Sequence, residues 1–502
     1  MKKLNFLFYS LLTTGISFAQ KPNWQNLDLQ KDGVFGVSTE KAYSEIIVHK
    51  KKFKPVIVAV IDSGVDTAHE DLKAVIWKNP KENYDGSDND LDGYSDDLHG
   101  WNFIGGPNGN INQENLELTR MIRAGKADVM MFETYRAKVA EDKEAVDDVE
   151  SYQKILNGMI GRMNKDTPEL ADFKSYQPQD SREEQVRGRM ISILERNPDF
   201  ESYKSELNGY HDHFKEELDY NLNPDFNPRS IVGDDTLNAS EHFYGNPDVM
   251  GPAALHGTHV TGIIAAVRNN DIGIQGISDH VWIMSIRTVP NGDERDKDVA
   301  NAIRFAADHG ARVVNMSFGK SYSPDKKVVD EAVKYALSKD VLLIQAAGNE
   351  GKNIDREPNF PNRIYGDSTG IAGAWIVVGA SGWVDDSTLV APFSNYGRKS
   401  VDVFAPGMQI YSSIPGSKYQ EESGTSMAAP VVAGLAALIR EYYPKLTAIQ
   451  VKQIILQSVV KPSENVRVMS DGQSRSVPFS EICVSGGVVN VYKALFMAAN
   501  FH

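Results

Sequence analysis

Continuous apolar runs rich in β-branched residues recur through the chain and constrain its fold more than any other feature. The first of them, PVIVAVID at residues 55–62, ends in an acid. Runs without polar alternation are typical of strands that are buried on both faces of a parallel sheet. Similar runs follow at residues 281–289, 311–319, 341–349, 374–381 and 400–407.

Helical patterns separate several of these runs. The segments DKDVANAIRFAADHG at 296–310 and DKKVVDEAVKYALSKD at 325–340 place apolar residues at helical spacing. Strands that alternate with helices predict an α/β fold with a doubly wound, mostly parallel sheet. In such sheets, chemistry is expected at the carboxyl ends of the strands, where loops meet helix N-termini.

Bulk composition narrows the class of protein further. The 502 residues are 41% hydrophobic, which is enough for a sizeable core, and the formal net charge is −15. Because nucleic acids and anionic membranes are bound by clustered Lys and Arg, neither is an expected partner. Cys483 is the only cysteine, which excludes an intrachain disulfide. Its segment SEICVSGG has the pattern of a strand with a packed apolar thiol.

The N-terminus has the features of a secretory signal. Residues 1–19 combine a short basic start, an apolar stretch and a small-x-small cleavage site that ends at Ala19. We therefore expect a periplasmic or secreted protein. No later stretch has the roughly 20 apolar residues of a membrane span, and we expect a monomer. Residues 20–54 form an N-terminal extension with a short helix around residues 39–47.

Residues 112–222 differ from the rest of the chain, because they are highly charged in both signs and have no strand-like run. Apolar residues recur at steps of three and four, which predicts two long helices packed as a hairpin. They are Val149, Tyr152, Leu156, Met159 and Met163, and then Phe200, Tyr203, Leu207, Tyr210 and Phe214. DSREEQ at 180–185 predicts a capping box for a shorter helix between them. This insertion either borders a substrate cleft or serves as a scaffold.

Four polar residues stand where the predicted sheet places its chemistry. Asp62 ends the first strand, His256 and Ser426 each open a helix, and Asn349 ends the strand at 341–349. A serine becomes a nucleophile when an imidazole takes its proton and an acid orients that imidazole, while an amide can stabilise an oxyanion. Taken singly, Ser426 could be an N-cap and Asn349 a turn former. Pro430 lies in the helix that Ser426 is predicted to open, and we expect it in the first turn, where its missing N–H has no helical partner to lose.

The segments that carry these residues resemble the motifs of the subtilisin-like serine peptidases, the subtilases. They are VIVAVIDSGVDTAHEDL, HGTHVTGIIAA, VVNMSFG, AAGNEG and GTSMAAPVVAGLAALI. The resemblance implies that Asp62, His256 and Ser426 are a catalytic triad and that Asn349 is an oxyanion donor. It also implies a substrate-binding strand at Ser317, Phe318 and Gly319, and a wall of the specificity pocket at Ala346, Ala347 and Gly348.

The resemblance therefore predicts a serine endopeptidase that acts on protein or peptide substrates. Its peptidase domain would comprise residues 55–111 and 223–502, interrupted by the insertion at 112–222. The alternative is a peptide-binding module that keeps the groove without turnover. Asp355, Glu357 and Asp367 fall in a segment that follows the predicted pocket wall, which favours basic residues in substrates.

DNDLDGYSDD at residues 88–97 has the residue order of a calcium loop. Alternate acids direct oxygens at one centre, and the glycine permits a sharp turn. The predicted ligands are Asp88, Asp90, Asp92, the Tyr94 carbonyl and Asp96. His99 stands where such loops usually have a glutamate, so Asp97 or a water would complete the shell. The alternative is a solvated acidic turn. The turn-rich segment 223–235 could hold a second cation as it re-enters the core.

Overall fold

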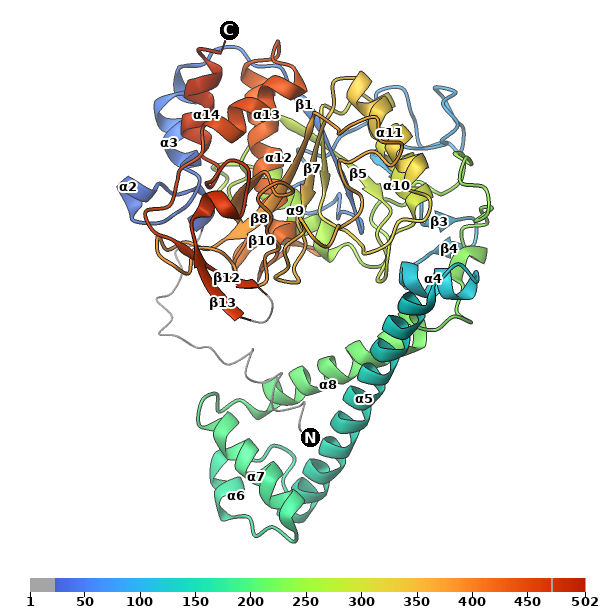
Figure 1. Cartoon of the computed structure of the whole chain (residues 1–502), viewed down its shortest axis with the longest axis vertical. Coiled ribbons are helices and arrows are strands. Elements are labelled where there is room, and N and C mark those ends of the chain that lie inside the picture. The colour runs from blue at the N-terminus through green and yellow to red at the C-terminus, as the bar shows by residue number, and fades with distance from the viewer. Residues whose placement is uncertain (1–22, 471–472, 502) are drawn as a thin grey trace. The chain divides into compact units, whose positions relative to one another are not determined.

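The computed structural model describes residues 23–470 and 473–501, so the predicted signal at 1–19 lies outside the described residues. The chain divides into two compact units. One consists of residues 118–227 and covers most of the predicted insertion, whereas residues 20–117 and 228–502 belong to the other. The second unit contains the sheet (Figure 1).

The sheet is seven-stranded and parallel throughout, with the order β2-β5-β1-β6-β7-β8-β9. Each of the predicted apolar runs provides a strand, and β2 is the one strand of this sheet that the pattern did not predict. The bounds are β1 Val56–Asp62, β2 Gly100–Asn102, β5 Val281–Arg287, β6 Val313–Met316, β7 Leu342–Ala346, β8 Trp375–Ser381 and β9 Val403–Pro406.

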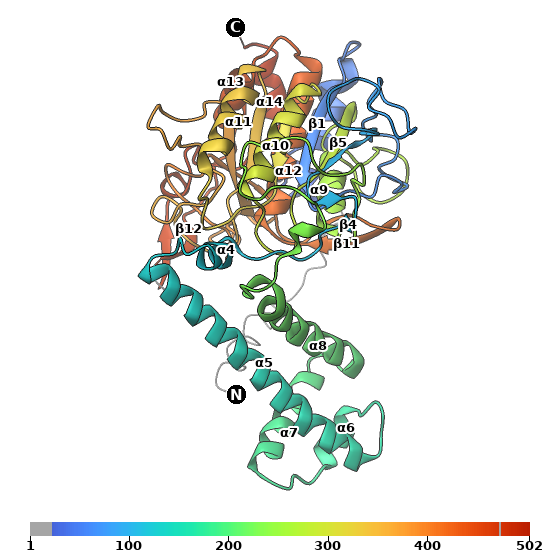
Figure 2. The ribbon, with the colours of Figure 1, turned by 90° about the vertical axis from the view of Figure 1, so that its right-hand side faces the viewer.

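Helices cover both faces of this sheet, as the sequence pattern predicted (Figures 1 and 2). Alternate residues of β1 enter different cores: Val58 packs with helices α9 and α12, and Ala59 packs with α10 and α11. The bounds of the helices in this unit are α2 Leu29–Asp32, α3 Thr39–Glu45, α9 Leu255–Ala265, α10 Asp296–Asp308, α11 Lys326–Ser338, α12 Thr425–Tyr442, α13 Ala448–Gln457 and α14 Val491–Ala498.

Three short hairpins accompany the main sheet. They are β3 Gly105–Gly106 with β4 Gly109–Asn110, β10 Ile410–Ile414 with β11 Lys418–Glu422, and β12 Val466–Ser470 with β13 Gln473–Val477. Cys483 is buried as predicted, but the strand predicted around it is wrong. A short 3-10 helix, Phe479–Glu481, and turns occupy that segment, since apolar residues can be buried without joining a ladder.

The other unit is helical and has its own core. Its helices are α4 Glu117–Arg123, which begins at the unit boundary, α5 Val129–Met163, α6 Leu170–Ser175, α7 Ser181–Leu194 and α8 Phe200–Glu216. Helices α5 and α8 run antiparallel, because Lys138 pairs with Glu217 at 2.7 Å and Tyr203 donates to the Tyr152 hydroxyl at 3.0 Å. None of the helices in the described part of the chain has the length and apolar character needed to cross a bilayer.

The cap of α7 differs from the predicted capping box. Asp180 accepts the backbone N–H groups of Arg182 and Glu183, as an N-cap residue should. The Glu183 carboxylate, however, accepts the N–H of Gln179 at 2.9 Å and the Tyr176 hydroxyl at 2.9 Å instead of reaching back to Asp180. Glu183 therefore binds the preceding loop rather than the N-cap residue, and the predicted capping box does not form.

Buried ion pairs anchor the segment that follows the insertion. The Arg229 guanidinium binds both oxygens of Asp298 on α10, at 2.8 and 3.1 Å, and lies 2.6 Å from Asp234. Lys297 also contacts Asp234. Because protein cations neutralise Asp234, the structure lends no support to a second cation site in this segment.

Replacing Asp298 should destabilise the sheet-containing unit strongly. D298A removes one of the carboxylates that neutralise buried Arg229, and breaking a buried pair costs about 3–5 kcal/mol. E331A, which breaks the exposed Lys327 to Glu331 pair at 3.9 Å, should cost about 0–1 kcal/mol. Urea unfolding of both variants measures the difference. Equal losses of unfolding free energy would contradict the role given to the Arg229 pair.

Candidate active site

The predicted acid and base contact each other at the carboxyl end of the sheet. Asp62 is the last residue of β1, and His256 lies in the first turn of α9. The Nδ1 atom of His256 lies 2.7 Å from Oδ1 of Asp62, an oxygen that also accepts the Ser63 N–H at 2.7 Å. Asp62 is buried, while 38% of the His256 side chain is exposed. This pairing leaves Nε2 as the nitrogen that can take up a proton.

A glycine allows this contact to form. A Cβ atom on Gly257 would lie 2.2 Å from the carbonyl oxygen of Gly64 and 3.1 Å from Cβ of Asp62. The first of these distances is far below van der Waals contact, so a side chain at this position would push α9 away from the end of β1.

Charges near His256 favour its protonated form. Burial lowers the pKa of His256, but the charge and hydrogen bond of Asp62 and the charge of Glu422 outweigh burial, so the pKa is raised above its ordinary value. His259, one turn further along α9, behaves differently, because burial lowers its pKa to about 4. Its Nε2 atom lies 2.9 Å from the Ile410 carbonyl oxygen, and the side chain is fully buried, so His259 has a packed structural role.

The predicted nucleophile is bound to the predicted substrate strand. The Ser426 hydroxyl donates to the Ser317 carbonyl at 3.1 Å, and the Ser317 hydroxyl donates to the Ser426 carbonyl at 2.9 Å. In the parallel register of β1 and β6, Ile61 pairs with Met316, so Ser317 follows beside Asp62. The sheet therefore brings the segments of the acid and the nucleophile to one edge.

Pro430 has a different role from the one predicted for it. It lies in the second turn of α12, where its N–H would have bonded to the Ser426 carbonyl. Because proline has no N–H, that carbonyl is left without its helical partner and accepts the Ser317 hydroxyl instead. The proline thereby frees the acceptor for a hydrogen bond between α12 and the predicted substrate-binding segment.

The side-chain amide oxygen of Asn349 is held by Thr425. Both the backbone N–H and the hydroxyl of Thr425 donate to Asn349 Oδ1, each at 2.9 Å. These two bonds identify the other amide atom as Nδ2, a donor on an exposed side chain at the opening of α12. An amide fixed in this way can stabilise developing negative charge.

Comparisons with known proteins identify the family of this chain. The sequence profile of the subtilase family matches residues 54–477. The chain belongs to the subtilase family. A thermophilic serine proteinase of Bacillus sp. (strain AK1) is 38% identical over 247 residues, which are 49% of this chain and 55% of that protein. Thermitase of Thermoactinomyces vulgaris is 35% identical over 48% of this chain and 74% of its own length.

Among solved structures, proteases from Pseudoalteromonas arctica PAMC 21717 have 27% identity to this chain. That match covers 51% of this chain and 74% of the other, with a TM-score of 0.40. This subtilase chain thus spans about half of the proteinase from strain AK1 and about three quarters of thermitase.

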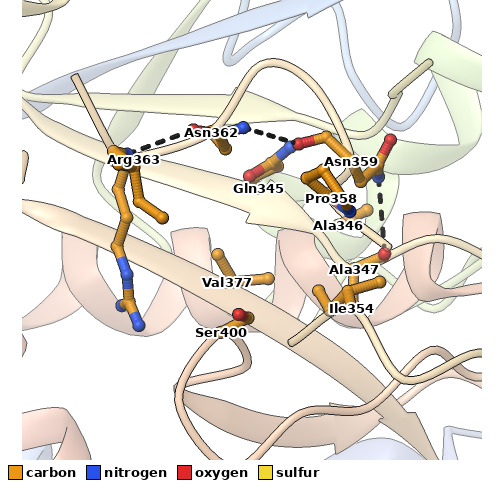
Figure 3. Close-up of a pocket in the computed structure, with 11 residues that line it drawn as sticks. Gln345, Ala346, Ala347, Ile354, Pro358, Asn359, Asn362, Arg363, Val377 and Ser400 are labelled. Atoms are coloured by element: carbon orange, nitrogen blue, oxygen red, sulfur yellow. Dashed lines mark hydrogen bonds between the residues drawn. The ribbon is translucent and has the colours of Figure 1, made fainter. Parts of the chain in front are cut away.

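A small cavity adjoins the predicted pocket wall of this subtilase chain (Figure 3). Ala346 and Ala347 line it, and Asn359 donates to the Ala347 carbonyl at 3.4 Å. Asn359 also crowds Gly319 of the predicted substrate strand, where a Cβ atom would lie 2.6 Å from its amide nitrogen. Asn359 therefore bridges the two predicted substrate-binding segments.

The acids expected to line a specificity pocket do not line this cavity. Asp355 accepts the backbone N–H of Ser400 at 2.8 Å, Glu357 pairs with Lys352 at 3.0 Å, and Asp367 pairs with Lys334 at 2.5 Å. The charged residue among the described lining residues is Arg363. The lining of this cavity therefore gives no support to the interpretation that these acids favour basic substrate residues, which stays a prediction.

Three residues that position the site were missed in the sequence. Thr425 orients Asn349, Asn315 donates to the Ser317 hydroxyl at 2.9 Å, and Glu422 acts on the charge of His256. Thr425 and Asn315 belong to the quoted motifs GTSMAAP and VVNMSFG, so the motifs contained them without revealing their contacts. No sequence pattern identified Glu422, because its effect on His256 arises only when β11 folds beside α9.

The acidic loop, residues 79–99, gathers part of the predicted calcium shell. Ligand atoms of Asp90 and Asp92 lie within 4.8 Å of each other and of a His309 nitrogen, and Asp90 also groups with Glu82 and Asp88. Asp96 belongs to neither group, because its Oδ1 accepts the N–H groups of residues 85 and 86. The Tyr94 ring packs against Trp101 in the core. Calcium itself stays a prediction.

Replacing Gly257 should uncouple His256 from Asp62. G257A places a methyl group against the Gly64 carbonyl and should lower kcat/KM on a small peptide about 10²-fold, because ångström-scale misplacement of a catalytic group has such an effect. G209A is the control, since that helical glycine has open space around its Cβ position and should leave kcat/KM unchanged. Wild-type activity in G257A would refute the close-approach argument.

Removing the Glu422 charge should shift the pH profile to lower pH. A general base acts when neutral, so kcat/KM rises as pH rises through the pKa of His256. Glu422 raises that pKa, and E422Q should move the rising limb to lower pH. E421Q, which changes an exposed neighbour on the same strand, should not move it. Profiles measured with an uncharged peptide test this, and equal shifts in both variants would contradict it.

Proposed function

We propose that this chain is an exported serine endopeptidase that hydrolyses peptide bonds through an acyl-enzyme. The observation that carries the proposal is the 2.7 Å contact between His256 Nδ1 and Asp62, which leaves Nε2 available as a base. Membership of the subtilase family and its serine proteinase relatives support the same reaction. The predicted signal at residues 1–19 supports export.

The first half of the reaction forms an ester on Ser426. Its Oγ attacks the scissile carbonyl carbon while its proton passes to Nε2 of His256, and Asp62 stabilises the resulting imidazolium. The negative charge that develops on the carbonyl oxygen is met by Nδ2 of Asn349 and the backbone N–H of Ser426. His256 then returns the proton to the amine as the C–N bond breaks. In the second half, water replaces the amine and releases the acid.

Substrate binding would also release the nucleophile from its resting contact. The Ser426 hydroxyl now donates to the Ser317 carbonyl at 3.1 Å. An extended substrate that pairs with residues 317–319, which directly follow β6, would supply a backbone N–H for the same carbonyl. The hydroxyl would then be free to turn to His256, so that the attacking geometry forms when substrate is present.

The acidic loop is proposed to bind a divalent cation, for which calcium is the ion predicted from the sequence. Support comes from the two groups of ligand atoms that share Asp90 and from the mutual repulsion of acids placed this close. Such an ion would be structural, because the fold contacts described for the loop do not include the predicted triad.

Covalent labelling separates this enzyme from a peptide-binding module that lacks turnover. A fluorophosphonate should label the wild-type chain at Ser426 and should fail to label S426A, because the reagent needs an activated serine. Absence of labelling in the wild-type chain would favour the binding module.

Asn349 gives a second test, which is measured as peptide turnover. N349D keeps an oxygen for Thr425 but removes the amide donor, and losing one oxyanion donor in subtilisin lowers kcat about 10²–10³-fold. We expect a loss of that size with little change in KM, measured on a peptide substrate. An unchanged kcat would remove Asn349 from the mechanism.

A further inference from the structure

A pocket of about 300 Å³ gathers positive charge at the amino ends of β1 and β6. Three cationic side chains from different segments line it. Lys54 shortly precedes β1, Arg312 directly precedes β6, and Arg440 lies in the last turn of α12. None of the described lining residues is acidic, although the chain as a whole has a formal net charge of −15. The pocket is separate from the candidate active site, which lies at the carboxyl end of the sheet.

The two arginines of this pocket share a single acid. Both guanidinium groups donate to Oδ2 of Asp340, Arg312 at 2.6 Å. The other oxygen of Asp340 is already used, since its Oδ1 accepts the Ala448 N–H at 2.7 Å in the first turn of α13. One carboxylate therefore serves two guanidinium groups and a helix start.

Neighbouring acids do not make up the difference. Lys54 is exposed and has no ion pair with any residue that the structure describes. Glu441 follows Arg440 in the sequence, but it does not line the pocket, and its Oε2 accepts the Ser278 hydroxyl at 3.1 Å. Three cations thus face the one carboxylate of Asp340, which leaves two positive charges without a counter-ion from the pocket.

Arg440 shows the effect of this surplus. Only 2% of the residue is exposed, and burial and the charge of Arg312 lower its pKa below the ordinary value despite the opposing charge of Asp340. Donors also remain on both arginines. Within the described part of the chain, three hydrogen bonds use the guanidinium of Arg440 and two use that of Arg312, whereas each group has five N–H donors. The pocket residues thus have both charge and hydrogen-bond donors to spare.

We propose that the pocket lined by Lys54, Arg312 and Arg440 binds a compact dianion of the phosphate or sulfate class. Two uncompensated positive charges match such an ion, because a phosphate monoester carries about −1.5 to −2 charges at pH 7. Guanidinium groups bind phosphate oxygens through paired N–H donors, and an ammonium adds a point charge. The exposed Lys51 and Lys52, which precede Lys54 in the run KKKFK, would attract an anion toward the pocket.

A bound anion would join three segments that are far apart in the sequence. It would contact the residues that lead into β1 and β6 and the last turn of α12, and so stabilise the amino end of the sheet. The proposed peptidase reaction does not depend on it, because the contact between His256 and Asp62 lies at the other end of β1. Anion binding should therefore change stability without changing kcat/KM on a small peptide.

Binding of inorganic phosphate and sulfate to the full chain tests the proposal, in an S426A background that prevents self-digestion. Each ion should bind with a stoichiometry of one by calorimetry and raise the melting temperature, because a ligand of the folded state stabilises it. Acetate, which carries one charge, should bind more weakly at the same ionic strength. R312Q and K54Q should each weaken sulfate binding about tenfold, as the loss of one charged contact predicts. K73Q, which removes an exposed lysine outside the pocket, should bind sulfate like the parent.

Several outcomes would overturn the proposal. Failure of both dianions to bind would leave Asp340 as the partner of the two arginines, and equal weakening in K73Q would indicate general charge attraction instead of a site. Arg440 is left unchanged because it is buried, whereas 39% of the Arg312 side chain is exposed and Lys54 is also exposed, so both variants are expected to fold. Glycerol 2-phosphate distinguishes the source of the group, since binding tighter than that of phosphate would assign the pocket to an ester and weaker binding to the free ion.

Discussion

The site depends on how closely helix α9 approaches the end of strand β1. Imidazole and carboxylate side chains are short, so a contact of 2.7 Å between His256 and Asp62 needs nearly touching backbones. Gly257 permits this because any Cβ atom there would overlap the Gly64 carbonyl. The same closeness buries Asp62, and a buried carboxylate is stable only with donors at hand. His256 and the Ser63 N–H are those donors, so folding and catalytic geometry share one requirement.

A proline in helix α12 helps to position the Ser426 segment of the site. Pro430 removes a hydrogen bond from α12, which would ordinarily destabilise a helix interior. Here the freed Ser426 carbonyl accepts the Ser317 hydroxyl, and Asn315 in turn donates to that hydroxyl. Ser426 is thereby fixed to the segment after β6 that is proposed to hold substrate.

The sequence was most informative where burial alone decides the structure. Strands such as β1 and β8 are covered on both faces and read as continuous apolar runs, whereas β2, three residues at the sheet edge, leaves no such pattern. Asp62, His256 and Ser426 were predictable because each ends a strand or opens a helix. The effect of Glu422 on His256 was not, because it depends on a hairpin that pairs through contacts distant in sequence. Around Cys483, apolar character predicted burial but could not predict backbone conformation.

Buried acids in this chain differ in the cationic side chain that pairs with them, and that side chain indicates whether the acid has a structural or a chemical role. Asp298 is matched by Arg229, whose charge is permanent, and the pair holds two segments together. Asp62 is matched by an imidazole, whose charge can change, and so the same chemistry can pass a proton. Asp92 and Asp97 also face an imidazole, but there the acids outnumber the charge it can supply. The contact of His309 with these two acids joins the acidic loop to the residue that follows α10, so an imidazole holds two segments together here as Arg229 does at Asp298.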